Sequence, residues 1–251
     1  MGLEGKRGFC VEITISNKVD ADLVALKYAD DFFGAHKTVA KLIGFNEHVS
    51  NGSATFCDGT GIAAGQVVFV GVGPLREFRY EGIQNFGRRI VKLCRQNHRP
   101  IRHVALTIHG PGYGLDPEEF FLSMVAGLVE ERSRGEHRLR KITIAELSEK
   151  RCEIFESVLK SRLHEFGLRP GVLGANANLL SDTIDEPVLR DNIITFGVKA
   201  EEKPRLFVAM PFEDEFMDEF EIGFHEAAKA DSFICERLDL ESFKDPARKR
   251  K

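Results

Sequence analysis

The residues best suited to chemistry in this sequence form a glycine-rich loop, Ile108-His-Gly-Pro-Gly-Tyr-Gly114, between a predicted strand and Asp116-Pro117. Closely spaced glycines let backbone N–H groups approach a phosphate without obstruction by Cβ atoms. A helix that starts behind the loop would add a dipole favourable to negative charge. The same glycines also fit a tight turn that only reverses the chain, and spacing alone leaves both interpretations open. The candidate ligand residues are His109, Gly110, Gly112, Tyr113 and Gly114.

The cysteines offer a second, weaker chemistry. The five cysteines, at positions 10, 57, 94, 152 and 235, include no CxxC pair and no nearby histidine at metal-ligand spacing. The sequence therefore predicts no metal site, and the odd, scattered count indicates reduced thiols instead of a disulfide framework. Cys57 and His109 would suit a nucleophile pair, but nothing in the sequence brings them together. The catalytic residues stay unassigned.

Strand and helix patterns alternate through the first two thirds of the chain. The apolar run Gln66 to Gly73 is typical of a strand covered on both faces, and Tyr80 to Asn97 has helical spacing. Further helices are predicted over 32–43, 117–132 and 148–166, with strands over 9–15, 22–26, 101–108 and 140–144. This alternation predicts an α/β fold, a three-layer sandwich whose sheet is mixed and mostly parallel.

The pattern weakens after residue 166, and this change sets the predicted domain boundaries. Glycines and prolines between 167 and 203 indicate a linker or a loosely structured crossover. A buried-type strand, a loop and an amphipathic segment then follow from Pro204. We predict a first domain over 1–166, a linker or crossover over 167–203 and a β-α-β remnant over 204–251.

Charge and hydropathy limit the partners. A formal net charge of −4 argues against chain-wide electrostatic affinity for nucleic acid, so the sequence gives no strong nucleic-acid signal. The basic end, Arg248 to Lys251, is typical of a solvated terminus. No signal peptide pattern and no apolar run of membrane length is present. We expect a cytoplasmic protein with no membrane partner, and homo-oligomerisation stays open.

Residues 9–166 resemble a macro domain. Glu12-Ile-Thr14 and the following Lys18 to Val24 are similar to the family's opening strand, and Gly110 to Pro117 is similar to its second phosphate loop. The N-terminal domain of leucine aminopeptidases is an equally good match around Val67 to Val72 and Tyr80 to Leu93.

The macro-domain resemblance implies a site for ADP-ribose or a related nucleotide. It places Glu12 where the family reads the adenine amino group, and Gly112, Tyr113 and Gly114 at the diphosphate and distal ribose. The family's first glycine loop is replaced here by Phe32 to Lys37, so His36 and Lys37 would supply charge in place of backbone amides. The family's asparagine motif is also missing, which argues against ADP-ribosyl hydrolysis.

The stretch Pro204 to Phe212 resembles the opening strand of nucleoside deoxyribosyltransferase-like and TIR-like proteins, and Ile234 to Asp239 resembles their second strand. The resemblance implies a nucleoside or nicotinamide-nucleotide pocket. It is incomplete, because the helix that carries the family's catalytic glutamate has no counterpart in the sequence. The implied pocket residues are Met210, Pro211 and Phe212.

Together the two resemblances imply a sensor module that binds an ADP-ribose-like or cyclic nucleotide and controls a bacterial, anti-phage effector. An alternative is an N-glycosidase, deoxyribosyltransferase-like or NAD-consuming, completed by missing sequence or a second chain. A second alternative is a non-catalytic scaffold. No cofactor is certain, the candidate ligand being ADP-ribose or another NAD-derived molecule. Whether the protein is an enzyme stays open, and the sequence argues against catalysis by this chain alone.

Overall fold

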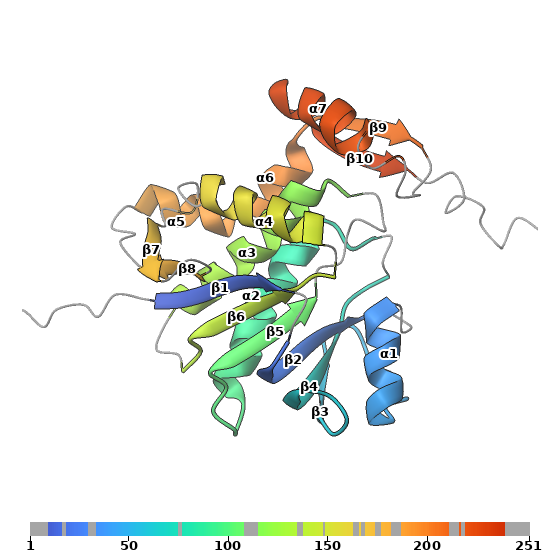
Figure 1. Cartoon of the computed structure of the whole chain (residues 1–251), viewed down its shortest axis with the longest axis vertical. Helices are drawn as coiled ribbons and strands as arrows, with labels where there is room; N and C mark the ends of the chain where they lie inside the picture. Colours follow the sequence, from blue (N-terminus) through green and yellow to red (C-terminus); the bar gives the residue numbers. More distant parts are fainter. Residues whose placement is uncertain are drawn as a thin grey trace, which may run out of the picture.

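The computed structural model describes residues 10–16, 19–29, 34–74, 77–107, 115–134, 138–147, 149–162, 166, 169–173, 177–181, 187–210, 216 and 219–238. Eight strands within these residues form one sheet in the order β3-β4-β2-β5-β6-β1-β8-β7 (Figure 1). They are β1 (Cys10–Ser16), β2 (Ala21–Tyr28), β3 (Ala54–Asp58), β4 (Ala64–Gly71), β5 (His103–Thr107), β6 (Lys141–Ala145), β7 (Arg169–Leu173) and β8 (Ala177–Ser181).

The sheet is mixed and mostly parallel, as predicted. Strands β1, β6, β5, β2 and β4 pair in parallel. Strand β3 joins β4 as an antiparallel hairpin, and β8 and β7 add two antiparallel strands beside β1. The parallel strands at the centre read as apolar runs because helices cover both of their faces.

Helices on the two faces complete the three layers. The helices are α1 (Gly34–Ile43), α2 (Tyr80–Gln96), α3 (Pro117–Ser133) and α4 (Glu149–Arg162). Successive residues of β2 alternate between two cores: Leu23 and Ala25 pack with α2 and α3, whereas Leu26 packs on the α1 side. Helix α4 stacks on α3 through Phe155 and Phe121, whose ring centroids are 4.8 Å apart. The predicted α/β sandwich is therefore confirmed.

Helices α2 and α3 pack with almost no space between their backbones. A Cβ atom on Gly127 would lie 2.0 Å from the carbonyl oxygen of Gln84, and one on Gly87 would lie 2.6 Å from the carbonyl of Met124. Every described residue of α3 from Glu118 to Arg132 is buried. Because α3 is enclosed on all sides, its sequence lacks the one-sided apolar stripe of a surface helix.

The segment predicted as a linker or crossover contains regular structure. Besides β7 and β8 in the sheet, it forms α5 (Pro187–Ile194) and α6 (Phe196–Glu202). The N–H of Gly197 donates to Gln84 Oε1 at 2.6 Å, which ties α6 to α2. The described parts of 167–203 thus extend the sheet and its helical cover.

The last described residues form the predicted β-α-β remnant. Strands β9 (Arg205–Ala209) and β10 (Ile234–Leu238) pair in parallel, joined through η5 (Glu219–His225), a π-helix, and α7 (Glu226–Ala230). We call β9, η5, α7 and β10 the C-terminal unit; it lies beyond α6, at the top of Figure 1. Its own small core consists of Val208, Phe220, Ala228 and Cys235. Within the described residues, no helix combines the length and hydropathy needed to cross a membrane.

Candidate functional site

The carboxyl ends of β2, β4, β5 and β6 lie along one edge of the sheet, which we call the carboxyl edge. Helices α1 to α4 each begin there, directly after one of these strands. The N-terminal end of a helix carries partial positive charge, and open α/β sheets bind ligands beyond the carboxyl ends of their strands. The topology therefore makes this edge the candidate site for an anionic ligand.

Lys27, near the end of β2, is the buried cation of the carboxyl edge. Its side chain is only 4% exposed, and its Nζ lies 4.8 Å from the ring centroid of Phe78. Burial lowers the pKa of Lys27 to about 7. The amine therefore exists in both protonation states near neutral pH, and a bound anion would stabilise the charged state.

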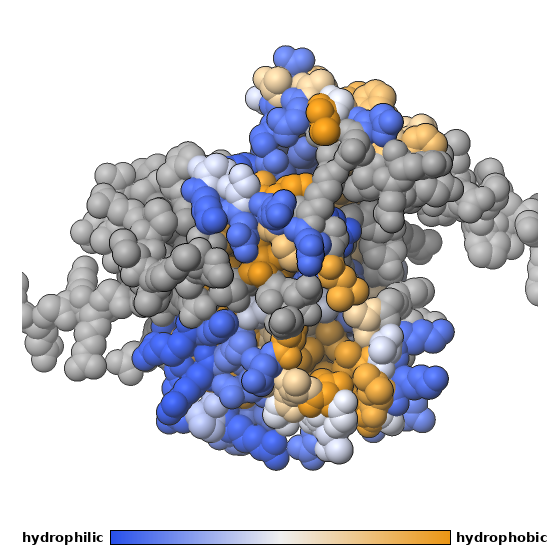
Figure 2. All heavy atoms as spheres, viewed as in Figure 1, coloured by the Kyte–Doolittle hydropathy of each residue, from blue (hydrophilic) through white to orange (hydrophobic). Residues whose placement is uncertain are grey.

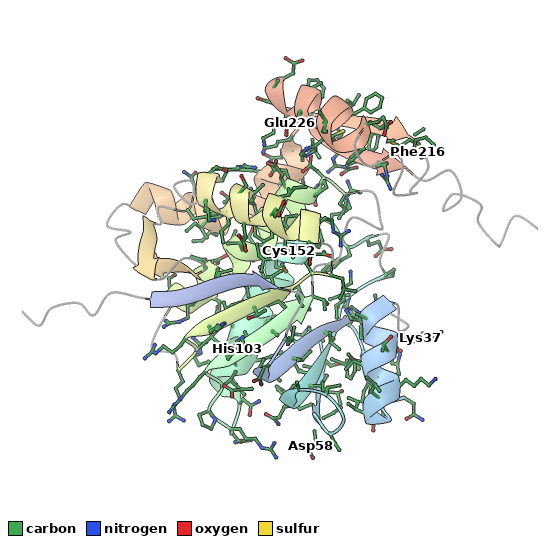
Figure 3. The ribbon with its side chains drawn as sticks, viewed as in Figure 1. Lys37, Asp58, His103, Cys152, Phe216 and Glu226 are labelled. Carbon is green, nitrogen blue, oxygen red and sulfur yellow. The ribbon has the colours of Figure 1, made fainter. Side chains whose placement is uncertain are left out.

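His36, in the first turns of α1, lies at the same edge. Its Nε2 is 3.1 Å from Thr107 Oγ1 at the end of β5. Burial, followed by the charge of Lys27, lowers the pKa of His36 to about 3. His36 is thus a neutral hydrogen-bonding group at pH 7, whereas the sequence suggested that it supplies charge. Lys37 is exposed on the outer side of α1 (Figure 3).

The sequence analysis missed Lys27 as a site residue. The available signal was a lysine inside the otherwise apolar end of a strand, Ala25-Leu-Lys-Tyr28. That signal identifies an unusual residue, but only the fold shows that its ammonium group is buried next to Phe78.

Asp116 terminates the loop that carries the predicted phosphate site. Its Oδ1 accepts the N–H groups of Glu118 and Glu119, both at 3.0 Å, so it caps α3 as predicted. Its Oδ2 accepts from His225 Nε2 at 3.1 Å and from the N–H of Cys235 at 3.0 Å. Because Asp116 already occupies these N–H groups with negative charge, the start of α3 adds little to phosphate binding. A phosphate would depend on the N–H groups of the loop itself.

Asp116 and His225 stabilise each other's charged forms. Burial alone would raise the pKa of Asp116, but the hydrogen bond and charge of His225 and the N–H groups of Glu119 and Cys235 hold it below its usual value. Burial alone would lower the pKa of His225, yet the hydrogen bond and charge of Asp116, followed by the charge of Glu118, raise it. Asp116 therefore joins α3 to the C-terminal unit.

Tyr80 forms a second connection between the same parts. Its hydroxyl accepts the N–H of Asp116 at 3.0 Å and donates to Glu236 Oε1 at 2.9 Å. Burial, followed by the charges of Glu236 and Asp116, raises the pKa of Tyr80 well above its usual value, so the phenol remains a donor. Arg79 pairs with the same Glu236 oxygen at 2.7 Å. The first residues of α2 and α3 thus hold β10 in place.

Most residues proposed from the sequence lie outside the described residues: His109, Gly110, Gly112, Tyr113, Gly114, Pro211 and Phe212. The backbone of Glu12 lies in β1, opposite Lys141 of β6 and Leu179 of β8. Met210 is half-buried and packs against the small core of the C-terminal unit. That contact gives Met210 a packing role.

Four of the five cysteines have described side chains, and none of these four is an activated thiol. Cys57 and Cys152 are half-buried, Cys94 and Cys235 are buried, and all four are free. Burial, followed by the charges of Glu47 and Asp58, raises the pKa of Cys57. The nucleophilic thiolate is therefore disfavoured at the position that the sequence singled out.

One group of described side chains has the spacing of metal ligands. Oxygen or nitrogen atoms of Glu118, His225 and Glu226 lie within 4.8 Å of one another. However, Lys229 Nζ lies 2.6 Å from Glu118 Oε1 and 3.9 Å from Glu226 Oε1. The ammonium group already balances these carboxylates.

Comparison with solved structures relates the fold to macrodomains. A macrodomain variant from Oceanobacillus iheyensis is similar with a TM-score of 0.50 and 13% identity, over 64% of this chain and 97% of that one. The Trypanosoma brucei macrodomain gives a TM-score of 0.50 and 15% identity, over 59% of this chain and 66% of that one. Such low identities establish the fold alone. Macrodomains from the same two organisms have been crystallised with ADP.

Two sequence-level comparisons gave no match. No protein-family model matches the sequence, and no curated protein matches it. The macro-domain resemblance of the first part is therefore supported through its fold, whereas nothing supports the deoxyribosyltransferase-like or TIR-like resemblance of residues 204–251.

Proposed function

We propose that this protein binds ADP-ribose or a closely related nucleotide diphosphate at the carboxyl edge. The macrodomain-like sheet with Lys27 buried near the end of β2 carries the proposal. In the proposed complex the ammonium group of Lys27 faces the diphosphate, and neutral His36 and Thr107 offer hydrogen bonds. The loop Gly110 to Gly114 supplies backbone N–H groups, with His109 and Tyr113 beside the distal ribose.

The role at the adenine that the macro-domain resemblance gives Glu12 stays a separate prediction. The backbone of Glu12 lies opposite Lys141, the first residue of β6, at the end of the strands opposite the carboxyl edge. A carboxylate accepts hydrogen bonds from an exocyclic amino group, so Glu12→Gln should weaken ADP-ribose more than a ligand without adenine, such as ribose 5-phosphate. Equal weakening of both would remove Glu12 from the adenine site.

The sensor role is a further part of the proposal, and the Asp116 and Tyr80 network supports it. The phosphate loop ends directly before Asp116, and Asp116 holds both His225 and the backbone of Cys235. A ligand on the loop would therefore act next to the contact that positions the C-terminal unit. Control of an anti-phage effector in a bacterium is a prediction that extends beyond this contact.

The two alternatives have less support. An N-glycosidase would need a pocket at Met210, Pro211 and Phe212, but packing already accounts for Met210. A scaffold would use an exposed apolar face of α2, yet Ile83, Phe86 and Ile90 of that face are buried. Nucleotide binding is the function that these observations support best.

A thermal-shift and calorimetry series tests the proposal. ADP-ribose, ADP, NAD and cyclic ADP-ribose are compared with free nucleosides, and a ligand at about a hundred times its dissociation constant should add roughly 2.7 kcal/mol of stability. Gly112→Val should abolish this gain without unfolding the chain. Gly223→Val is the matched control, because a Cβ atom at Gly223 meets no atom within 4 Å. No shift with any nucleotide diphosphate would refute the proposed function. Normal ligand binding by Gly112→Val would refute the role of the loop Gly110 to Gly114 in binding.

A further inference from the structure

Charge is unevenly distributed along the chain. The sequence has 39 acidic residues among 251, yet none lies between positions 82 and 115, a stretch that contains six lysine or arginine residues. Three more cations, Arg138, Arg140 and Lys141, fall in a second acid-free stretch over 137–145. The net charge of −4 therefore hides a local excess of positive charge.

The fold brings parts of both stretches together at the end of the strands opposite the carboxyl edge. We call this surface the amino edge and define it as residues 97–103 and 138–141. The N–H groups of Arg140 and Lys141 donate to the carbonyl of Arg102 at 2.7 and 3.0 Å, and His103 lies opposite Lys141 between β5 and β6. Arg102 and Arg138 are exposed. Figure 2 shows hydrophilic side chains at the lower left, where β5 and β6 begin in Figure 1.

Other cations in or near the two stretches have acidic partners within the fold. Arg88 pairs with Glu130, Arg95 pairs with Glu131 at 3.0 Å, and Arg134 contacts both glutamates. These pairs brace α2 against the end of α3, so their charges serve packing. Within the amino edge Arg99 pairs with Asp58 at 3.4 Å, and Arg102 and Arg138 are exposed.

A hollow of about 530 Å³ opens in the amino edge, with Arg99 and His103 in its lining (Figure 3 labels His103). Asp20 and Asp22 also line it. Asp22 Oδ2 accepts the N–H groups of Arg102 and His103 at 2.8 and 2.9 Å, so this carboxylate anchors the basic loop. A hollow of this size has room for a nucleotide-sized group next to the basic loop.

Two kinds of polyanion fit a basic surface, a nucleic-acid backbone and an anionic membrane. A membrane-binding surface would present large apolar side chains that insert beside the cations. The two large apolar residues of the amino edge, Ile101 and Leu139, are only 2% and 1% exposed. We propose that the amino edge binds the phosphodiester backbone of single-stranded RNA or DNA, without reading the bases.

Fluorescence anisotropy with a labelled RNA oligonucleotide and its DNA counterpart tests this proposal on the whole chain. Contact with about four phosphates of a single strand predicts a log–log salt slope near about −2.8, so the dissociation constant should rise about 50-fold from about 50 mM to about 200 mM salt. The double variant Arg102→Glu/Arg138→Glu should weaken binding at least about tenfold at the lower salt concentration. If this charge reversal lowers the thermal midpoint of the protein, the neutral double variant Arg102→Gln/Arg138→Gln is used to compare oligonucleotide affinity instead.

The matched control is Lys160→Glu/Lys199→Glu, which changes the net charge equally at exposed positions of α4 and α6. It should bind like the unchanged chain. Equal weakening of oligonucleotide binding by both double variants would refute the amino edge as the binding site. Binding to phosphatidylserine vesicles without binding to either oligonucleotide would refute it as well. Displacement of the oligonucleotide by saturating ADP-ribose would also overturn it. Because the two edges are separate, loss of ADP-ribose binding alone leaves this proposal intact.

Discussion

Replacing Lys27 with Met should change how the stability of this protein depends on pH. An unfolded lysine keeps its proton up to a pKa of about 10.5, whereas burial lowers the pKa of Lys27 to about 7 in the folded chain. Between these two values the unfolded state binds more protons than the folded state. The free energy of unfolding contributed by Lys27 therefore rises with pH from about 7 to about 10.5.

The magnitude follows from the size of the pKa difference. A difference of about 3.5 units corresponds to roughly 5 kcal/mol over the whole window, at about 1.4 kcal/mol per unit. From about pH 7 to about pH 9 the contribution amounts to about 2 kcal/mol, because half of the folded molecules already lack the proton at pH 7. Lys27→Met removes this dependence and replaces the amine with an apolar chain of similar length.

Urea denaturation of both proteins at about pH 7, 8 and 9 measures the effect. The stability difference between Lys27→Met and the unchanged chain should shrink by about 2 kcal/mol over that range. The thiols also titrate there, but they are the same in both proteins and cancel in the difference. Lys37→Met, at an exposed lysine, is the control and should follow the unchanged chain. Parallel pH curves for Lys27→Met and the unchanged chain would refute the buried-amine argument.

Three further predictions follow from particular contacts. Asp116→Ala leaves the N–H groups of Glu118, Glu119 and Cys235 without their acceptor. Urea denaturation should show that the free energy of unfolding falls by about 2–4 kcal/mol, and an unchanged urea midpoint would contradict the stabilising role of these hydrogen bonds. Gly127→Ala should lower the thermal midpoint much more than Gly223→Ala, because its Cβ would lie 2.0 Å from Gln84 O; equal midpoints would disprove the close helix contact. The dissociation constant for ADP-ribose should rise by up to about tenfold per pH unit above about pH 7, as Lys27 loses its proton. Calorimetry that shows the same affinity at each pH would mean that the charge of Lys27 does not contribute to ADP-ribose binding.

Sequence patterns predicted the central elements because each one is locally encoded. The apolar run around Val67 to Val70 and the helical spacing of Ile83, Phe86 and Ile90 depend only on neighbouring residues, and both elements form where expected. Asp116 and Pro117 likewise mark the start of α3, since a cap acts over three residues. The β-α-β order after Pro204 was also visible, although the family assigned to it found no support.

The weak pattern between 167 and 203 concealed two strands and two helices. Strand β8 pairs with β1, which lies more than 160 residues earlier, so the stability of β8 depends on a distant partner. Gly197 is similarly fixed by Gln84 Oε1. Local composition does not indicate such distant partners, and residues 167–203 were therefore predicted as a linker or crossover.

The sequence by itself determined the α/β class, the order and approximate positions of the central helices and strands, and the cap at Asp116, because these depend on side chains within a few residues of one another. Only the tertiary structure decided the charge states and the neighbours of the functional groups. Lys27 is an ordinary lysine in the sequence, and its lowered pKa arises from burial at the end of β2. His36 loses its charge through the same burial and through Lys27, and Arg102 meets Arg140 only where β5 and β6 begin. Desolvation and long-range charge are properties of the folded chain, so no local pattern specifies them.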